Sequence, residues 1–444
     1  MAATSAFDRE GQLPPPRRER AGQTGTLADA TTLVPEEAMV YVTALMGTPV
    51  FLTEVIAQSH HRWQRLTTTS DYLLAPLATF DRPDDVDPAS WPFHHVTVQP
   101  SKATSGLGPD RLRRVPAHSS SFYSLYRPGG PLAVDVALVQ VSEPGPDGRF
   151  SLGVNGGAAL EVVCSAEIVI AEVNPRMPYV AGPAAFERSA FDLLVEVEHE
   201  LLSLEPKRPP DRPTGGELIA EYLAAEVPDG ATLEYGIGAI PDAALAGLAD
   251  HSNLGLHSGL IGDAAIDLIE AGALDGASKS VDTGLHVASA FIGTRTAAEW
   301  VRDRDDVVIV ASNYSHGVPV LARQHRFAAI NSAVEIALDG SVNAEQIGTT
   351  TVSGPGGQPD FAAGAALAID GRSIVALTST AGRGRFSRLV SRLDPAVPTT
   401  VPGYLADLVV TEFGVARLRG ADLGQRAERL AAISHPDFRS QLTP

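Results

Sequence analysis

The stretch LGLHSGLIGD (residues 254–263) places a histidine, a serine and a glycine where an apolar run gives way to a helical pattern. His257 and Ser258 are candidates for acid/base catalysis. No carboxylate accompanies them at this predicted strand end. A Ser-His-Asp hydrolase site that includes Asp263 is not indicated. GLHSG does not match the G-x-S-x-G turn, and adjacent residues rarely form a nucleophile–base pair.

Two glycine-rich stretches could bring backbone N–H groups to a ligand. In EYGIGAIPDA, Gly236 and Gly238 lie between a predicted strand and a predicted helix, which suits an anion or a developing oxyanion, although any tight turn would look similar. In TTTVSGPGGQPDFAAGAAL, three glycines fall within four positions ahead of Gln358, which favours close approach of a ligand: Gly354, Gly356 and Gly357. The Gly-Lys-Ser/Thr ending of a phosphate-binding P-loop is absent.

Charged and metal-ligating side chains give weaker signals. AGRGRFSRLVSR concentrates Arg383, Arg385, Arg388 and Arg392, which indicates either a phosphate pocket or a solvated face. The pairs HH at 60–61 and 94–95 are not expected to bind metal, because neighbours on a strand point to opposite faces and no ligand cluster accompanies them. The single cysteine, Cys164, lies in an apolar stretch and is expected to be a buried structural thiol.

Composition narrows the class of protein. Hydrophobic residues make up 44% of the 444 residues and the formal net charge is −19, so the chain is globular and nucleic acid is not an expected partner. Charges interrupt every apolar run before the roughly 20 residues that a membrane span needs. Residues 1–19 carry no apolar signal-peptide core, so we expect a cytoplasmic protein without a membrane partner.

The chain is long enough for two domains, and its apolar runs alternate with helical patterns in the manner of α/β folds. VDVALVQVS (134–142) and EIVIAEVN (167–174) are predicted to be parallel strands buried on both faces. PDAALAGLAD and DAAIDLIEAG are predicted helices, with Pro241 at the first position of one and Asp263 capping the other. The proline- and charge-rich LEPKRPPDRPTGGE is the predicted linker. These patterns divide the chain into a disordered tail (1–30) and two α/β domains (31–208 and 209–444).

Taken together, the motifs resemble those of the acetyl-CoA hydrolase/transferase family, which includes 4-hydroxybutyrate CoA-transferases. The resemblance is carried, in order, by DVALVQVSEPGPDGRFSLGVN, VIAEVNPRMP, GIGAIPDA, LGLHS, INSAVEIALDG, SGPGGQPDFAAGA, SRLV, VVTEFGVARLRG and HPDFR. It implies two open α/β domains of the CoA-transferase type, facing each other across an active-site cleft, usually in a homodimer or larger homo-oligomer. It also implies an acyl-CoA or other acyl thioester as substrate, with no tightly bound cofactor and no metal.

The family's chemistry uses a glutamate that attacks the thioester and then carries CoA as a glutamyl thioester. By resemblance this glutamate follows the His-Ser or His-Thr pair, and here that position is Gly259. Glycine supplies no nucleophile, so double displacement through this position is impossible. The family usually has glutamine where this chain has Glu234. Glu234 is either a relocated base or nucleophile, or a buried residue tolerated at a changed site.

The resemblance assigns the remaining site residues to binding and polarisation. Gly236 and Gly238 would form the oxyanion and thioester pocket, and Asn331 and Ser332 would position the acyl thioester. Gly354, Gly356, Gly357 and Gln358 would line the CoA channel. Separately from the resemblance, the basic cluster predicts that Arg383, Arg385 and Arg388 lie near a CoA phosphate site. We therefore expect an enzyme that acts on an acyl thioester by hydrolysis, intramolecular acyl transfer or cyclisation. The alternatives are a CoA-transferase that uses Glu234, and a non-catalytic CoA-binding or partner subunit.

Overall fold

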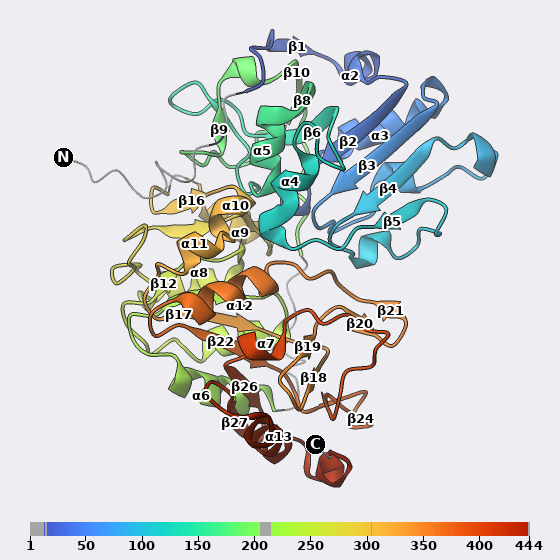
Figure 1. The fold of residues 1–444 in the computed structure, drawn as a ribbon. Helices are drawn as coiled ribbons and strands as arrows, with labels where there is room; N and C mark the ends of the chain where they lie inside the picture. Colours follow the sequence, from blue (N-terminus) through green and yellow to red (C-terminus); the bar gives the residue numbers. More distant parts are fainter. Residues whose placement is uncertain (1–12, 14–15, 205–214, 303, 443–444) are drawn as a thin grey trace. The chain divides into compact units, whose positions relative to one another are not determined.

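The structure is a computed structural model that describes residues 13, 16–204, 215–302 and 304–442. The described residues fold into two compact units, drawn in Figure 1. The first comprises the described residues of Met1–Glu205 and Ser289–Tyr314, and the second those of Pro206–Ala288 and Ser315–Pro444. The sequence suggests a single division near residue 208, whereas the structure returns one later segment to the first unit. Most of the predicted linker lies outside the described residues.

In the described part of the first unit, eight parallel strands form one sheet in the order β1-β10-β8-β6-β2-β3-β4-β5. They are β1 (Gln23–Gly25), β2 (Glu37–Val42), β3 (Arg65–Ser70), β4 (Phe93–Thr97), β5 (Leu112–Arg114), β6 (Val136–Val141), β8 (Ile168–Val173) and β10 (Leu193–Glu196). The helices are α2 (Leu27–Leu33), α3 (Val50–Gln58), α4 (Phe122–Tyr126), α5 (Ala158–Ser165) and α9 (Arg295–Trp300). The predicted strands β6 and β8 are confirmed, and nearly all their residues are buried.

The prediction that residues 1–30 form a disordered tail is wrong for the part that the structure describes. Strand β1 pairs with β10 at the sheet edge, and Thr26 begins α2 with a capping box. Arg20 is buried, and its Nε lies 3.0 Å from a carboxylate oxygen of Asp192. A buried arginine needs such a partner, and composition alone did not reveal one. Residues 1–12 lie outside the described part.

The segment 289–314 is built into the first unit by backbone hydrogen bonds. The amide of Gly156 donates to the carbonyl of Ser289 at 2.8 Å, and the amide of Gly157 donates to the carbonyl of Val310 at 3.0 Å. These two glycines immediately precede α5, so the later segment completes the start of that helix.

In the described part of the second unit, a six-stranded sheet has the order β12-β11-β17-β22-β26-β27. All its neighbours are parallel except β27, which returns antiparallel to β26. The strands are β11 (Thr232–Tyr235), β12 (Gly255–Leu256), β17 (Phe327–Asn331), β22 (Arg372–Ala376), β26 (Leu408–Thr411) and β27 (Gly414–Arg417). The strand order reverses at β11, which has β12 on one side and β17 on the other. A ligand of an open α/β sheet binds at the carboxyl ends of the strands beside such a reversal.

The helices of the second unit are α6 (Gly216–Glu226), α7 (Ala239–Ala246), α8 (Asp263–Glu270), α11 (Val318–Leu321), α12 (Gln358–Leu367) and α13 (Leu423–Ala432). Figure 1 shows α12 across β17 and β22, against which it packs. Two predicted helix starts are off by one or two residues. Helix α7 begins at Ala239, so Pro241 is its third residue, and α8 begins at Asp263 with Gly262 as its N-cap.

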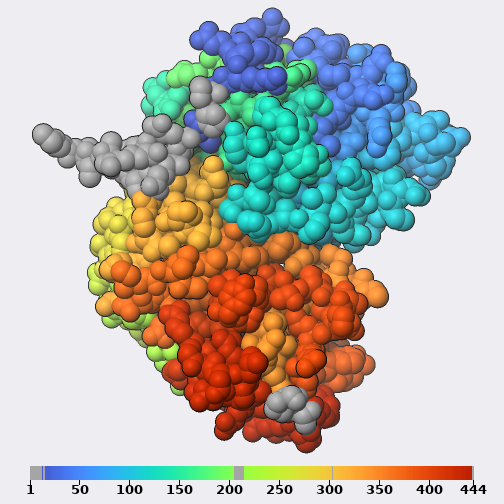
Figure 2. Space-filling view, viewed as in Figure 1, coloured from blue at the N-terminus to red at the C-terminus, as the bar shows by residue number. Residues whose placement is uncertain are grey.

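Short strands and loops complete the second unit. They include β18 (Glu335–Ala337), β19 (Val342–Asn343), β20 (Gln346–Ile347), β21 (Thr350–Thr351), β23 (Thr380–Ala381), β24 (Phe386–Ser387) and β25 (Leu389–Val390). On the face drawn in Figure 2, C-terminal segments coloured orange to red form much of this unit's surface. A small apolar core joins β17, α11 and α12 through Leu321, Phe327, Ala329, Phe361, Ala365 and Ala368. No helix in the described residues is long and apolar enough to cross a membrane.

Candidate active site

The candidate residues of the second unit gather where β11, β12 and β17 end. The GIG turn follows β11, His257 and its neighbours follow β12, and Asn331 is the last residue of β17. These three strands are adjacent and parallel, so their carboxyl ends meet at one edge of the sheet. This is the edge that the reversal of strand order marks for ligand binding.

Glu234 and Asn331 are in direct contact at this edge. The side-chain amide of Asn331 donates to Oε2 of Glu234 at 2.7 Å. Glu234 is 2% exposed, and burial raises the pKa of its carboxyl well above the usual value, while the hydrogen bond from Asn331 acts in the opposite direction. A raised pKa favours the neutral carboxyl, which is a weak nucleophile. The geometry suits a carboxyl that orients the Asn331 amide.

The GIG turn passes close to the same amide. A Cβ at Gly236 would lie 2.8 Å from Oδ1 of Asn331, so glycine allows this approach. The amide of Gly236 donates to the carbonyl of Ile330 at 2.9 Å and is therefore engaged within the sheet. Gly238 has φ of +129° and caps α7, whose first amides point out of the helix end. Of the two glycines predicted to form an oxyanion pocket, Gly236 provides space and Gly238 stands at the donor-rich helix end.

His257 and Ser258 are both fully buried. Nδ1 of His257 lies 3.4 Å from the amide nitrogen of Gln324, and the His257 backbone amide donates to Leu233 in the sheet. The backbone amide of Ser258 donates to Val287, and its hydroxyl accepts from the amide of Leu260 at 3.4 Å. Both backbones are thus fixed by neighbouring segments.

Gly259 faces the imidazole of His316. A Cβ at Gly259 would lie 2.9 Å from Nε2 and 3.3 Å from Cε1 of that ring. A Cβ at Gly357 would lie 2.7 Å from the same Nε2 and 2.5 Å from Cε2 of Phe361. The ring therefore occupies the space next to two backbone positions, and a side chain at either one would require the ring to shift.

His316 lies between α10 (Ser312–Ser315) and α11, and it is 6% exposed. Its ring packs on Phe361 with centroids 4.6 Å apart, and its Nδ1 lies 2.9 Å from the hydroxyl oxygen of Ser315. No motif in the sequence marks this residue. The signal in the sequence is a histidine in NYSHGVP, shortly after the apolar stretch VVIV (307–310).

The glycine-rich stretch leads into α12. Gly357 is the N-cap of that helix, and Gly356 has φ of +59°, which glycine adopts without strain. The side-chain amide of Gln358 donates to the carbonyl of Ser332 at 3.3 Å, which ties the start of α12 to the residue after β17. Gly354 is buried in the same loop. The structure thus connects the loop predicted to bind CoA with the end of β17.

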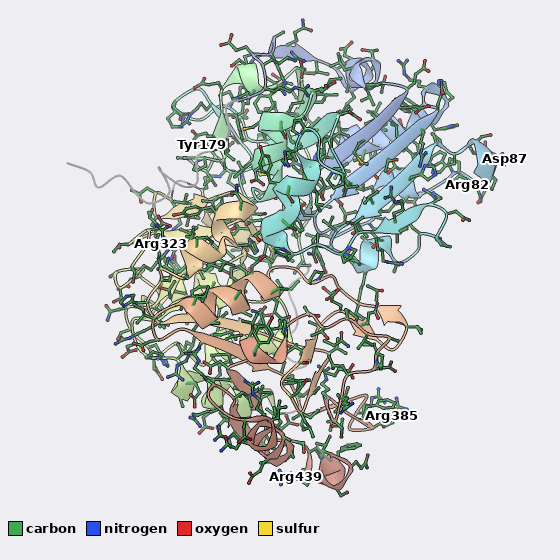
Figure 3. The ribbon with its side chains drawn as sticks, in the orientation of Figure 1. Arg82, Asp87, Tyr179, Arg323, Arg385 and Arg439 are labelled. Carbon is green, nitrogen blue, oxygen red and sulfur yellow. The ribbon has the colours of Figure 1, made fainter. Side chains whose placement is uncertain are left out.

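The arginine cluster is divided by the hairpin of β23 and β24. Arg383 and Arg385 are exposed on its turn, and Figure 3 shows Arg385 at the periphery of the molecule. Arg388 lies at the base, where its guanidinium donates to the carbonyl of Ala333 at 3.0 Å. Burial lowers the pKa of Arg388, and Glu412 partly opposes this. Arg388 therefore borders the segment that follows Asn331 and Ser332, whereas the other two face solvent.

A buried lysine supports the strand that ends at His257. Lys279 donates from Nζ to the carbonyls of Leu256 at 2.8 Å and of Leu285 at 2.7 Å. Burial lowers its pKa to about 7, against the opposing effect of Asp282. This amine holds β12 in place, and no motif in the sequence marks it.

The cysteine and the two adjacent-histidine pairs belong to the first unit. Cys164 is buried in α5, and burial raises the pKa of its thiol to about 12, which is the state of an inert structural thiol. His94 and His95 lie on β4, and His60 and His61 lie in a short 3₁₀ turn. Within the described ranges, no group of three or more His, Cys, Asp or Glu side chains is placed to hold a metal ion.

Comparison with known proteins identifies the family. Residues 23–190 match the acetyl-CoA hydrolase/transferase N-terminal domain, and residues 293–444 match the C-terminal domain. The chain is 40% identical over 311 residues to 4-hydroxybutyrate coenzyme A transferase of Clostridium kluyveri, covering 70% of this chain and 72% of the relative. It is 31% identical over 400 residues to succinyl-CoA:cyclohexane-1-carboxylate CoA transferase of Geobacter metallireducens, covering 90% and 89%.

A solved structure shows the same fold over nearly the whole chain. RipA from Yersinia pestis superposes with a TM-score of 0.85 at 27% identity, covering 95% of this chain and 96% of that one. The α/β architecture with parallel sheets in both units agrees with this similarity. The chain belongs to the acetyl-CoA hydrolase/transferase family.

Proposed function

We propose that this protein acts on an acyl-CoA thioester by direct attack on the thioester carbonyl, without a glutamyl-CoA intermediate. The observation that carries the proposal is the contact between Gly259 and His316. The family resemblance puts the nucleophilic glutamate at position 259. Glycine there has no carboxylate, and the imidazole stands where a side chain would begin. Water or a group within the acyl chain would then be the attacking nucleophile.

The surrounding residues supply the other requirements of thioester cleavage. The Asn331 amide, oriented by Glu234, would bind the acyl-thioester end together with Ser332. The N-terminal end of α7 at Gly238 would stabilise the oxyanion, because helix N-termini favour developing negative charge. In this proposal a tetrahedral intermediate forms and then expels CoA as a thiolate. The products are free CoA and a carboxylic acid, lactone or other cyclised product.

CoA itself would bind along the glycine-rich loop and the arginine hairpin. The loop of Gly354, Gly356 and Gly357 allows close approach of a ligand, and Gln358 anchors it beside Ser332. Arg383, Arg385 and Arg388 would contact the phosphates, since guanidinium groups bind phosphate by charge-assisted hydrogen bonds. We expect a homodimer or larger homo-oligomer, which sedimentation velocity would test.

A second candidate function is CoA transfer to a free carboxylate. It is favoured by the names of two relatives, which are CoA transferases. It requires a nucleophilic carboxylate, and Glu234, which contacts Asn331, is the candidate for that role. Its burial and its hydrogen bond from Asn331 weigh against that role, because an attacking carboxylate must be ionised and must reach the substrate.

The test is incubation of the purified protein with a panel of acyl-CoA esters, with and without acetate, followed by mass spectrometry of small molecules and tryptic peptides. Free CoA or a cyclised product without acetate, with no CoA adduct on any peptide, supports direct attack. New thioester formed only with acetate and lost in Glu234→Gln supports transfer through Glu234. Absence of turnover with every ester supports a binding or partner subunit.

A further inference from the structure

We infer that His316 is the general base of this site, which takes a proton from the attacking water at its Nε2. The inference rests on the proposed function and adds to it the identity of the group that activates the nucleophile. Gly259 accounts for the absence of a nucleophilic carboxylate but does not identify the group that activates water. The imidazole of His316, beside Gly259, is a group that could activate water.

The position of Nε2 of His316 beside Gly259 supports this role. Nε2 of His316 lies 2.9 Å from where a Cβ of residue 259 would stand, so the ring nitrogen occupies the path along which a longer side chain would extend. The second glycine, Gly357, brings the start of α12 against the same nitrogen at 2.7 Å from its own Cβ position. Neither glycine places a side chain against this nitrogen. Nε2 therefore lies between the residue that aligns with the family nucleophile and the loop proposed to bind CoA.

The contacts that orient the His316 ring also support this role. The ring packs at 4.6 Å on Phe361, which is 2% exposed and belongs to the core of β17, α11 and α12. Nδ1 lies 2.9 Å from the hydroxyl oxygen of Ser315, which is fully buried. When the proton resides on Nδ1, the ring donates to Ser315 and Nε2 presents its lone pair toward Gly259. A base oriented by a hydrogen bond at its other nitrogen is the arrangement that general-base histidines require.

The chemistry balances without any further reactant. Nε2 takes a proton from water as the water oxygen forms a bond to the thioester carbonyl carbon. The tetrahedral intermediate collapses with cleavage of the C–S bond, and the imidazolium returns its proton to the departing CoA thiolate. Water and acyl-CoA give a carboxylic acid and CoA, and the histidine ends in its starting state. For an acyl chain with its own hydroxyl group, that hydroxyl replaces water and the product is a lactone.

The test measures steady-state hydrolysis by the full chain, using the ester that the wild-type protein cleaves fastest. His316→Gln keeps a polar side chain of similar size, and His316→Ala leaves a space that added imidazole can enter. We expect each to lower kcat by about 100-fold or more with KM changed less than about threefold, as befits loss of a general base. Added imidazole should restore at least tenfold activity to His316→Ala and none to His316→Gln. The matched control is His325→Gln, at an exposed histidine of the same unit.

The outcomes separate the two proposals. If the wild-type protein cleaves an ester and folded His316→Gln retains its kcat, the role of His316 is overturned while the proposed function stands. If His316→Ala loses activity without rescue by imidazole, although its thermal unfolding matches the wild type, the general-base role is also overturned. If the wild-type protein cleaves no ester, the proposed function fails, and this inference fails with it.

Discussion

Gly259 and His316 are in close contact, and the imidazole keeps its present position only while residue 259 has no side chain. A glutamate at position 259 and the present position of the His316 ring exclude each other, since the Cβ alone would lie 2.9 Å from Nε2. A side chain at position 259 would therefore require the His316 ring to move.

The exclusion predicts a coupled effect on stability. Gly259→Glu should destabilise the second unit by about 1–3 kcal/mol, the usual cost of overpacking. His316→Gly should relieve that clash, so the double variant should be at least about 1 kcal/mol more stable than the sum of the single effects implies. Chemical denaturation of all four proteins measures the coupling. Additive effects would show that the ring and a side chain at position 259 do not compete for space.

The same double variant should gain a chemical activity. Gly259→Glu with His316→Gly restores a carboxylate at the position that the family resemblance assigns to the nucleophile, with room to extend. We expect acetate-dependent formation of acetyl-CoA that the wild-type protein does not show, together with a CoA adduct on the peptide that contains residue 259. Gly259→Gln with His316→Gly is the control, because it restores size without a nucleophile.

Glu234 separates the two candidate functions through its bond to Asn331. Glu234→Gln retains an oxygen that can accept from the Asn331 amide, so activity should remain within about fivefold. Glu234→Ala leaves that amide without its acceptor, which costs about 1–3 kcal/mol and predicts a loss of roughly 10- to 100-fold. Steady-state kinetics distinguish the variants. Complete loss in Glu234→Gln would instead identify Glu234 as the nucleophile.

The arginine hairpin predicts a binding effect. Arg385→Gln should weaken CoA binding by about tenfold, corresponding to roughly 1.4 kcal/mol, with little change in kcat. Isothermal titration with CoA and with dephospho-CoA would show which phosphate is involved. Arg439→Gln is a suitable control, since Arg439 lies on the C-terminal 3₁₀ segment and is labelled in Figure 3. Equal affinities for wild type and Arg385→Gln would remove this hairpin from the CoA site.

Lys279 predicts a pH dependence of stability. Burial lowers its pKa from 10.5 to about 7, so between these values the unfolded chain holds a proton that the folded chain has lost. The free energy of unfolding then rises with pH, by up to about 1.4 kcal/mol per unit from this group. Lys279→Met removes that contribution. Thermal unfolding at pH 7, 8 and 9 should show the wild type gaining stability relative to the variant, and parallel curves would contradict this.

Much of the fold could be predicted from local patterns. The runs that became β6 and β8 are apolar except for Gln140 and Glu172, as expected of parallel strands buried on both faces. The order of the N-terminal region could not be predicted in this way. Arg20 reads as part of a charged tail, and only the fold shows that Asp192, distant in sequence, neutralises it. Helix starts were displaced because Pro241 is tolerated anywhere in the first turn of α7.

The candidate site residues that belong to sequence motifs could be predicted. The contacts between them, which depend on the fold, could not. Glu234, Gly259 and Asn331 stand in recognisable motifs, but the hydrogen bond between Glu234 and Asn331 depends on strand register. His316 has no motif of its own, and its significance comes only from the glycines that the fold brings against it. Lys279 was missed because a lysine in sequence is expected at the surface, while this one satisfies two carbonyls in the interior.

The return of residues 289–314 to the first unit affects how the chain can fold during synthesis. The carbonyls of Ser289 and Val310 accept from the amides of Gly156 and Gly157, so the first unit remains incomplete when its leading portion leaves the ribosome. At about 5–20 residues per second, the missing segment follows roughly 4–17 s later, after part of the second unit has been made. Neither unit corresponds to a continuous stretch of gene, so recombination at a single junction could not exchange one of them intact.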